Sequence, residues 1–155
     1  MGHSISALVC KPSAGIERLV DYDLTHIPVG NFVIVPLDAY HSDSWTERLG
    51  LGFRSGKTKI ILDNSLVHHI AEFAATDEYA IIETDCFGGV GDQIAAVYRS
   101  GQESPLWASE RVSAGAINHA LRMIGVKKRF GKDEFNTLGL GNYRRFDEYF
   151  EDYWD

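Results

Sequence analysis

The chain has 155 residues, enough for a real hydrophobic core, and we expect residues 1–155 to form a single domain. Its 12% of aromatic residues argues against disorder, and its net charge of −7 disfavours nucleic acid and anionic membrane surfaces as partners. No apolar run approaches the roughly 20 residues of a membrane span. The cysteines demand no oxidising compartment, so we expect a cytoplasmic protein.

The first half of the chain mixes predicted strands with short helices. Alternation over residues 5–9 predicts a strand, and Ser13 is placed to cap a short helix after it. The β-branched run at residues 31–35 predicts a central strand that is buried on both faces. Ser44 and Glu47 fit a capping box and predict a helical turn.

The second half predicts more strands, between two helices. A short strand is predicted at 59–62, and longer or clearer ones at 79–86, 93–99 and 106–109. Asn64 is predicted to cap a helix that runs through residue 75, and Ser113 a helix closed by Gly125. This order predicts an α+β domain with a mixed or antiparallel sheet and helices packed mainly on one face.

The last ten residues combine aromatic and acidic side chains in helical phase. The aromatic residues are Phe146, Tyr149, Phe150, Tyr153 and Trp154. The acidic residues between them are Asp147, Glu148, Glu151, Asp152 and Asp155. As an amphipathic helix, the segment would have an aromatic stripe and an acidic face. We favour the interpretation that the stripe docks on the core and the acids stay in water, with a basic partner as the alternative.

A glycine turn and two carboxylates form the main candidate for chemistry. Gly88–Gly91 follows a predicted strand, as a phosphate loop would, but no Gly-Lys-Ser/Thr follows it. A hairpin turn is therefore favoured. Glu83 and Asp85 share one strand face and could bind a metal or divide acid and base roles, with Asp92 across the turn. We favour a structural role for them.

The histidines and cysteines give weaker signals. His68 and His69 are adjacent on a predicted helix, so their side chains point about 100° apart and cannot chelate one metal ion. Cys10 and Cys86 fall in predicted strands, where a buried cysteine behaves as a small hydrophobic residue. We therefore predict no metal, no cofactor and no catalytic residue.

Three segments carry a resemblance to known proteins. They are Glu83-Thr-Asp-Cys-Phe-Gly-Gly-Val-Gly-Asp-Gln93, Ala116-Ile-Asn-His-Ala-Leu-Arg122 and Asp133-Glu-Phe-Asn-Thr-Leu-Gly-Leu-Gly141. In them the C-terminal half resembles a set of small uncharacterised bacterial proteins with an acidic, aromatic, glycine-rich hairpin, from which no activity transfers. In size, acidity and aromatic content the chain is also similar to the immunity partners of secreted bacterial toxins.

These observations lead to one functional hypothesis and two alternatives. The hypothesis is an immunity-type protein, not an enzyme, that neutralises a basic toxin domain, such as a nuclease, with acidic and aromatic side chains. The predicted partner-binding residues are Asp147, Glu148, Glu151, Asp152, Asp155, Trp154, Glu83, Asp85 and Asp92. The alternatives are a small enzyme that uses Glu83, Asp85 and Gly88–Gly91, and a structural subunit of a homo-oligomer.

Overall fold

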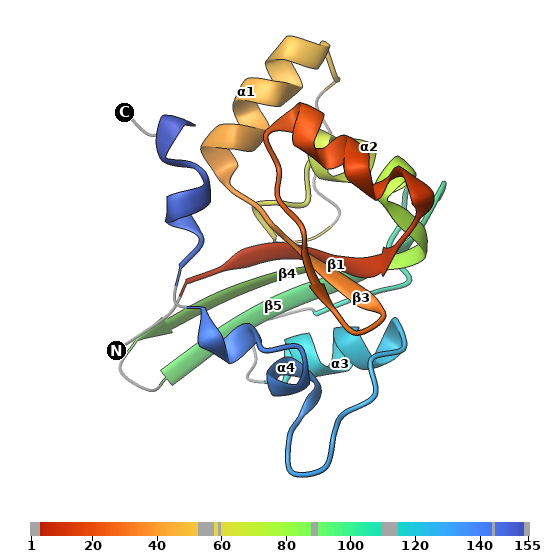
Figure 1. The fold of residues 1–155 in the computed structure, drawn as a ribbon, viewed down its shortest axis with the longest axis vertical. Coiled ribbons are helices and arrows are strands. Elements are labelled where there is room, and N and C mark those ends of the chain that lie inside the picture. Colours follow the sequence, from red (N-terminus) through yellow and green to blue (C-terminus); the bar gives the residue numbers. More distant parts are fainter. Residues whose placement is uncertain are drawn as a thin grey trace.

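The computed structural model describes residues 4–52, 58, 60–87, 90–109, 115–143 and 145–153. Within these residues the chain forms a six-stranded antiparallel sheet with the strand order β2-β3-β1-β4-β5-β6 (Figure 1). The strands are β1 (Ser6–Pro12), β2 (Ile27–Val29), β3 (Phe32–Pro36), β4 (Ala75–Phe87), β5 (Val90–Arg99) and β6 (Trp107–Ala108). The fold is therefore α+β, as predicted, with the sheet at its centre.

Helices cover both faces of the sheet. The α-helices are α1 (Ala39–Leu49), α2 (Ser65–Ala74), α3 (Ala116–Met123) and α4 (Glu134–Thr137). Figure 1 shows α1 and α2 above the sheet and α3 and α4 below it. None of the helices in the described ranges is long and apolar enough to cross a membrane.

The two-sided cover differs from the prediction that helices pack mainly on one face. The reason lies in the strands, because successive side chains of a strand point to opposite faces. Every residue from Ala7 to Cys10 is fully buried, as are the successive residues Ala80, Ile81 and Ile82 of β4. Apolar side chains on both faces of β1 and β4 require a helical layer on each side.

The glycine-rich segment joins two long antiparallel strands. The register of β4 and β5 pairs Phe87 with Val90 and Cys86 with Gly91, which confirms the predicted hairpin. Gly88 and Gly89 themselves lie outside the described residues. Since β5 begins at Val90, a strand follows the glycines where a phosphate loop would be followed by a helix.

Local capping signals place two of the helices correctly and mislead at a third. The fourth predicted cap, Ser113, lies outside the described residues, and the N-cap of α3 is Gly115. The Ser13 side chain accepts from the backbone of a 3-10 helix, η1 (Ala14–Tyr22), and Asn64 caps α2, as predicted. Helix α1, however, begins five residues before Ser44. Its cap is Asp38, whose carboxylate accepts a 3.0 Å hydrogen bond from the backbone N–H of His41.

Two short segments also differ from the sequence pattern. Strand β2 was not predicted, and it pairs only with β3 through a two-residue turn at Gly30 and Asn31. Gly30 has a φ of 60°, the positive value that the first position of a type II′ turn requires. Ile61 and Leu62, predicted as part of a strand, lie instead in a turn before α2.

The tail forms two short 3-10 helices, η3 (Asp147–Tyr149) and η4 (Glu151–Tyr153), in place of the predicted continuous helix. Carboxylates near a helix C-terminus oppose its dipole, and ten residues are too few for a stable isolated helix. Contacts with the core set the path of the chain instead. Phe146 and Phe150 are buried, and Tyr149 and Tyr153 pack half-buried against the core. The expectation that the aromatic residues dock on the domain itself is confirmed for these four, whereas Trp154 lies outside the described residues.

Candidate functional site

The tail is anchored by polar contacts to segments far away in the sequence. The Tyr153 hydroxyl accepts a 2.9 Å hydrogen bond from the indole Nε1 of Trp45 in α1 and donates to the carboxylate of Asp23 after η1. The ring of the buried His41 lies beneath the tail, with its centroid 5.2 Å from Phe150 and 5.0 Å from Tyr153. These contacts fix the 3-10 helices against α1 and η1.

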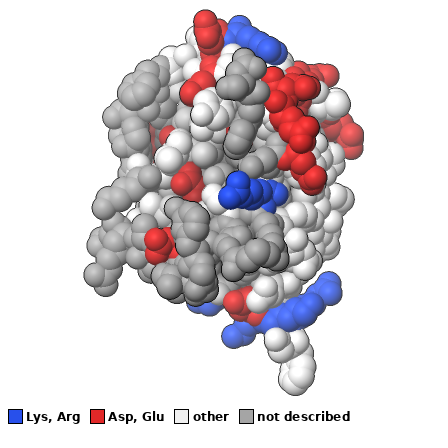
Figure 2. All heavy atoms as spheres, turned by 90° about the vertical axis from the view of Figure 1, so that its left-hand side faces the viewer, with Lys and Arg blue, Asp and Glu red and all other residues white. Residues whose placement is uncertain are grey.

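This docking places the tail, with its carboxylates, beside Asp23, which bonds Tyr153, and near Asp38, which acts together with Asp23 on the His41 ring under the tail. We call these carboxylates the acidic face. Its members are Asp23, Asp38, Glu148, Glu151 and Asp152. All except the half-buried Asp38 are exposed. Figure 2 views the side of the molecule that carries the tail and shows a concentration of acidic side chains toward its upper right.

Two carboxylates of the acidic face, Asp38 and Asp23, act on the buried ring of His41. Burial lowers the pKa of its imidazole, and this effect outweighs the hydrogen bond to the Tyr22 carbonyl and the attraction of Asp38 and Asp23, which raise it. Its Nε2 lies 2.7 Å from the Tyr22 oxygen and donates to it. His41 is therefore held neutral and supplies no positive charge to balance the carboxylates.

The predicted partner-binding residues do not all lie in one place in the structure. Glu148, Glu151 and Asp152 belong to the acidic face, whereas Asp92 is exposed on β5. Asp92 stands opposite Asp85 in the β4–β5 ladder. The side chains of Asp85 and Asp147, and all of Trp154 and Asp155, lie outside the described part of the chain.

Glu83 forms a group of its own, because its carboxylate is turned to the backbone of the chain. Oε2 accepts a 3.0 Å hydrogen bond from the N–H of Leu62, and the N–H of Ile61 is a second donor. Burial raises the pKa of Glu83, the backbone donors lower it, and the charge of Asp63 raises it again. The side chain ties the turn before α2 to the sheet.

A buried polar network, which sequence reasoning did not anticipate, lies between α2 and the sheet. The carboxylate of Asp63 contacts His68 Nε2 at 2.6 Å and accepts from Tyr98 at 2.5 Å and Thr58 at 2.7 Å. The other ring nitrogen of His68 lies 2.7 Å from the Tyr79 hydroxyl. Burial raises the pKa of Asp63, but these hydrogen bonds prevail and hold it at about 2.

This network explains His68 without metal chemistry. Its polar atoms are engaged with one another, and the side chain of Asp63 is fully buried. Among the described residues, no group of three or more histidine, cysteine or acidic side chains could hold a metal ion. Cys10 is a free and buried thiol, and burial raises its pKa to about 12. Neither feature forms an accessible reactive centre.

Comparison of the chain with models of known protein families, with curated proteins and with solved structures found no match in any of the three.

Proposed function

We propose that the protein is an immunity-type binding protein, which neutralises a basic protein domain by covering it with the acidic face. The observation that supports this proposal is the gathering of carboxylates by tertiary contacts. Asp23 and Tyr153 are separated by 130 positions, yet a hydrogen bond joins their side chains. The toxin class of the partner follows from the resemblance to immunity proteins.

The chemistry of the acidic face suits recognition of a basic surface. Its exposed carboxylates would accelerate encounter with a cationic partner, and salt would screen the attraction. Tyr149 and Tyr153 are half-buried next to these carboxylates, so part of each ring remains available for contact. Aromatic side chains of this kind carry much of the affinity in protein interfaces. Their anchored positions reduce the entropy lost on binding.

The enzyme alternative receives less support from the geometry. Its key carboxylate, Glu83, already accepts backbone hydrogen bonds from the turn before α2. A general acid or base needs a carboxylate that can reach the substrate. The proposal therefore places function in the acidic face.

The test uses the products of the genes adjacent to this one as candidate partners. Binding would be measured by biolayer interferometry at low and at high salt, and protection by growth of cells that co-express the two proteins. The test variant carries Glu148→Lys, Glu151→Lys and Asp152→Lys. The control variant carries the same change at three exposed residues elsewhere: Glu17, Glu72 and Glu103. Each triple moves the net charge from −7 to −1, since each reversal adds two charges.

If the acidic face binds the partner, the test variant should associate with the partner at least about tenfold more slowly at low salt and should no longer protect the cells. The control variant should lose much less, although its net charge is the same. Equal losses in the two variants would show that net charge alone matters and would refute the acidic face. Failure of every adjacent product to bind the wild-type chain would refute the immunity-type function.

A further inference from the structure

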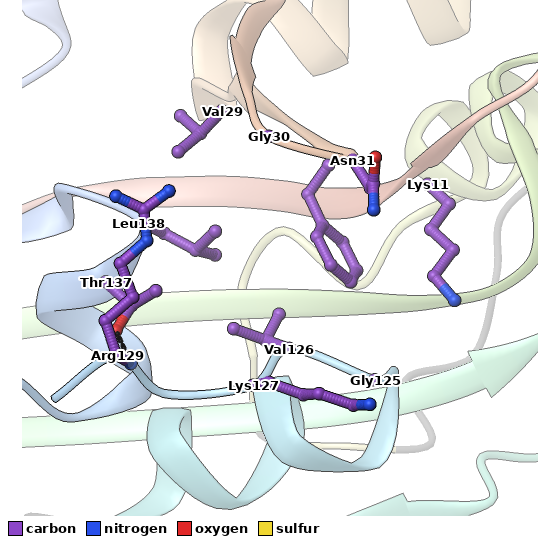
Figure 3. Close-up of a pocket in the computed structure, with 11 residues that line it drawn as sticks. Lys11, Val29, Gly30, Asn31, Gly125, Val126, Lys127, Arg129, Thr137 and Leu138 are labelled. Carbon is purple, nitrogen blue, oxygen red and sulfur yellow. Dashed lines mark hydrogen bonds between the residues drawn. The ribbon is translucent and has the colours of Figure 1, made fainter.

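A basic pocket of about 380 Å³ opens on the same side of the sheet as α3 and α4. Its walls come from the end of β1, the β2–β3 turn, the segment after α3 and the end of α4 (Figure 3). The volume lies within the range typical of small-molecule sites, about 300–1,000 Å³. None of the described residues that line the pocket is acidic.

Three cations line this pocket, although the protein as a whole is acidic. Lys11 and Lys127 extend their ammonium groups into one part of it, and the guanidinium of Arg129 lies at the opposite side (Figure 3). In the described part of the chain, no ion pair joins any of the three to a carboxylate. The cations come from segments more than 100 positions apart in the sequence.

Contacts within the fold orient the Lys11 side chain and fix the backbone at Arg129. The ammonium of Lys11 lies 5.7 Å from the centroid of the Phe32 ring, a cation–π contact that orients the side chain. Gly125 has a φ of 100°, and a Cβ at this position would meet the Lys11 ammonium at 3.4 Å. The backbone N–H of Arg129 donates a 3.0 Å hydrogen bond to the Thr137 hydroxyl. The pocket is thus built by tertiary contacts.

The end of α3 supplies too little negative charge to balance the three cations of the pocket. Gly125 and Lys127 follow the C-terminus of this helix, where the macrodipole is equivalent to about half a negative charge. Three positive charges would remain mostly uncompensated. The three cations repel one another, and this repulsion does not help the fold. A bound anion would remove it.

We infer that this pocket binds a small molecule that carries phosphate groups. Phosphate accepts several charge-assisted hydrogen bonds, and a guanidinium can bind it with two parallel bonds. Cations at two sides of the pocket suit a ligand with more than one anionic group. The Asn31 amide in the wall offers further donors. This binding is separate from the acidic face and does not depend on it.

Inorganic pyrophosphate is the first probe, titrated into the full chain by calorimetry, with inorganic phosphate as the weaker, single-group comparison. Lys127→Ala is the test variant, and Lys128→Ala is its matched control. Lys128 is the adjacent residue, is also exposed and does not line this pocket. We expect Lys127→Ala to weaken pyrophosphate binding at least about tenfold and Lys128→Ala to weaken it less than about twofold. Equal effects would indicate a diffuse basic surface and overturn the inference.

A second arm separates a free ligand from a lipid headgroup. Phe130, next to Arg129 in the sequence, is fully exposed. It would offer a membrane surface an apolar contact in addition to the charge of the pocket. Sedimentation with vesicles that contain phosphatidylinositol bisphosphate would be compared for the wild type and for Phe130→Ser. If pyrophosphate binds, and if the Phe130→Ser variant sediments with vesicles as the wild type does, the ligand is a free small molecule. Vesicle binding that requires Phe130, without pyrophosphate binding, overturns it, as does the absence of both.

Discussion

Trp45 and Tyr153 are joined by a hydrogen bond across 108 positions of the sequence, from the indole nitrogen to the phenol oxygen at 2.9 Å. The same hydroxyl donates to Asp23. Both partners of Tyr153 lie in the layer formed by η1 and α1, so the tail completes this layer. The tail therefore serves two purposes: its aromatic residues stabilise the fold, and its acids form part of the surface that we propose for binding.

Phe150→Ala is expected to destabilise the protein by about 3–5 kcal/mol, because a buried ring is lost and a cavity remains. The Phe150 side chain is 2% exposed and contacts the ring of His41. Glu151→Ala, one residue further on and exposed, is the control and should stay within about 0.5 kcal/mol. Urea denaturation measures both. A small effect of Phe150→Ala would mean that the tail does not dock in solution.

His41 is expected to make stability depend on pH. Burial lowers the pKa of His41 in the folded protein below its ordinary value of 6.5. The unfolded chain therefore binds a proton in a range where the folded protein does not. The stability that results is fully present above pH 6.5 and is lost as the pH falls toward the folded pKa, by at most about 1.4 kcal/mol per pH unit.

The measurement compares the free energy of unfolding of the wild type and of His41→Gln at several pH values between about 5 and 7. Glutamine can still donate to the Tyr22 carbonyl but does not titrate. Contributions from the other ionisable groups cancel in the difference between the two proteins. This difference should shrink as the pH falls, and a difference that is constant with pH would contradict a lowered His41 pKa.

Features encoded over a few residues could be predicted from the sequence. The caps at Ser13 and Asn64 and the β4–β5 hairpin depend on neighbours in the chain, and the structure has all three. The sequence misplaces the cap of α1 because Ser44 and Glu47 form a capping box, whereas Asp38 is followed three residues later by His41 and lacks the second half of that pattern. Strand β2 was missed because it has three residues, one of them a proline, and exists only through pairing with β3.

Features that depend on tertiary contacts could be predicted only in part. The expectation that residues 31–35 are buried on both faces already implied helices on both sides of the sheet, yet helix order alone suggested one side. The acids of the tail were visible in the sequence, but Asp23 and Asp38 were not connected with them. Only the docking of Tyr153 and Phe150 against η1 and α1 reveals that these carboxylates share a surface.

Tyr98→Phe is expected to raise the pKa of Asp63 and to shift acid unfolding to higher pH. Hydrogen bonds hold that pKa at about 2, below its ordinary value of 3.8, so Asp63 stabilises the protein above pH 3.8. This stability is lost as the pH falls from 3.8 toward about 2. Loss of one donor to the buried carboxylate should cost about 1–3 kcal/mol near neutral pH.

Tyr79→Phe is the matched control for this prediction. The two rings stack with centroids 5.9 Å apart, but the Tyr79 hydroxyl contacts His68 and the Tyr98 hydroxyl contacts Asp63. Acid unfolding followed by circular dichroism should therefore shift more for Tyr98→Phe than for Tyr79→Phe. The opposite order would show that Asp63 does not depend on the Tyr98 hydroxyl.

Glu83→Gln is expected to leave the protein as stable as the wild type near neutral pH, or more stable. Burial raises the pKa of Glu83 above its ordinary value of 4.5, so the folded protein holds the proton more tightly than the unfolded chain does. Its contribution is fully present below pH 4.5 and is lost as the pH rises through the folded pKa. A glutamine amide oxygen can still accept the hydrogen bond from the Leu62 N–H and carries no charge that burial penalises.

Glu83→Ala, the control, removes the acceptor and should cost about 1–3 kcal/mol, since the backbone donors of the turn would be left without it. Urea denaturation of both variants at about pH 7 decides the matter. A loss in Glu83→Gln as large as that in Glu83→Ala would mean that the ionised carboxylate itself is required for stability, and it would contradict a raised Glu83 pKa.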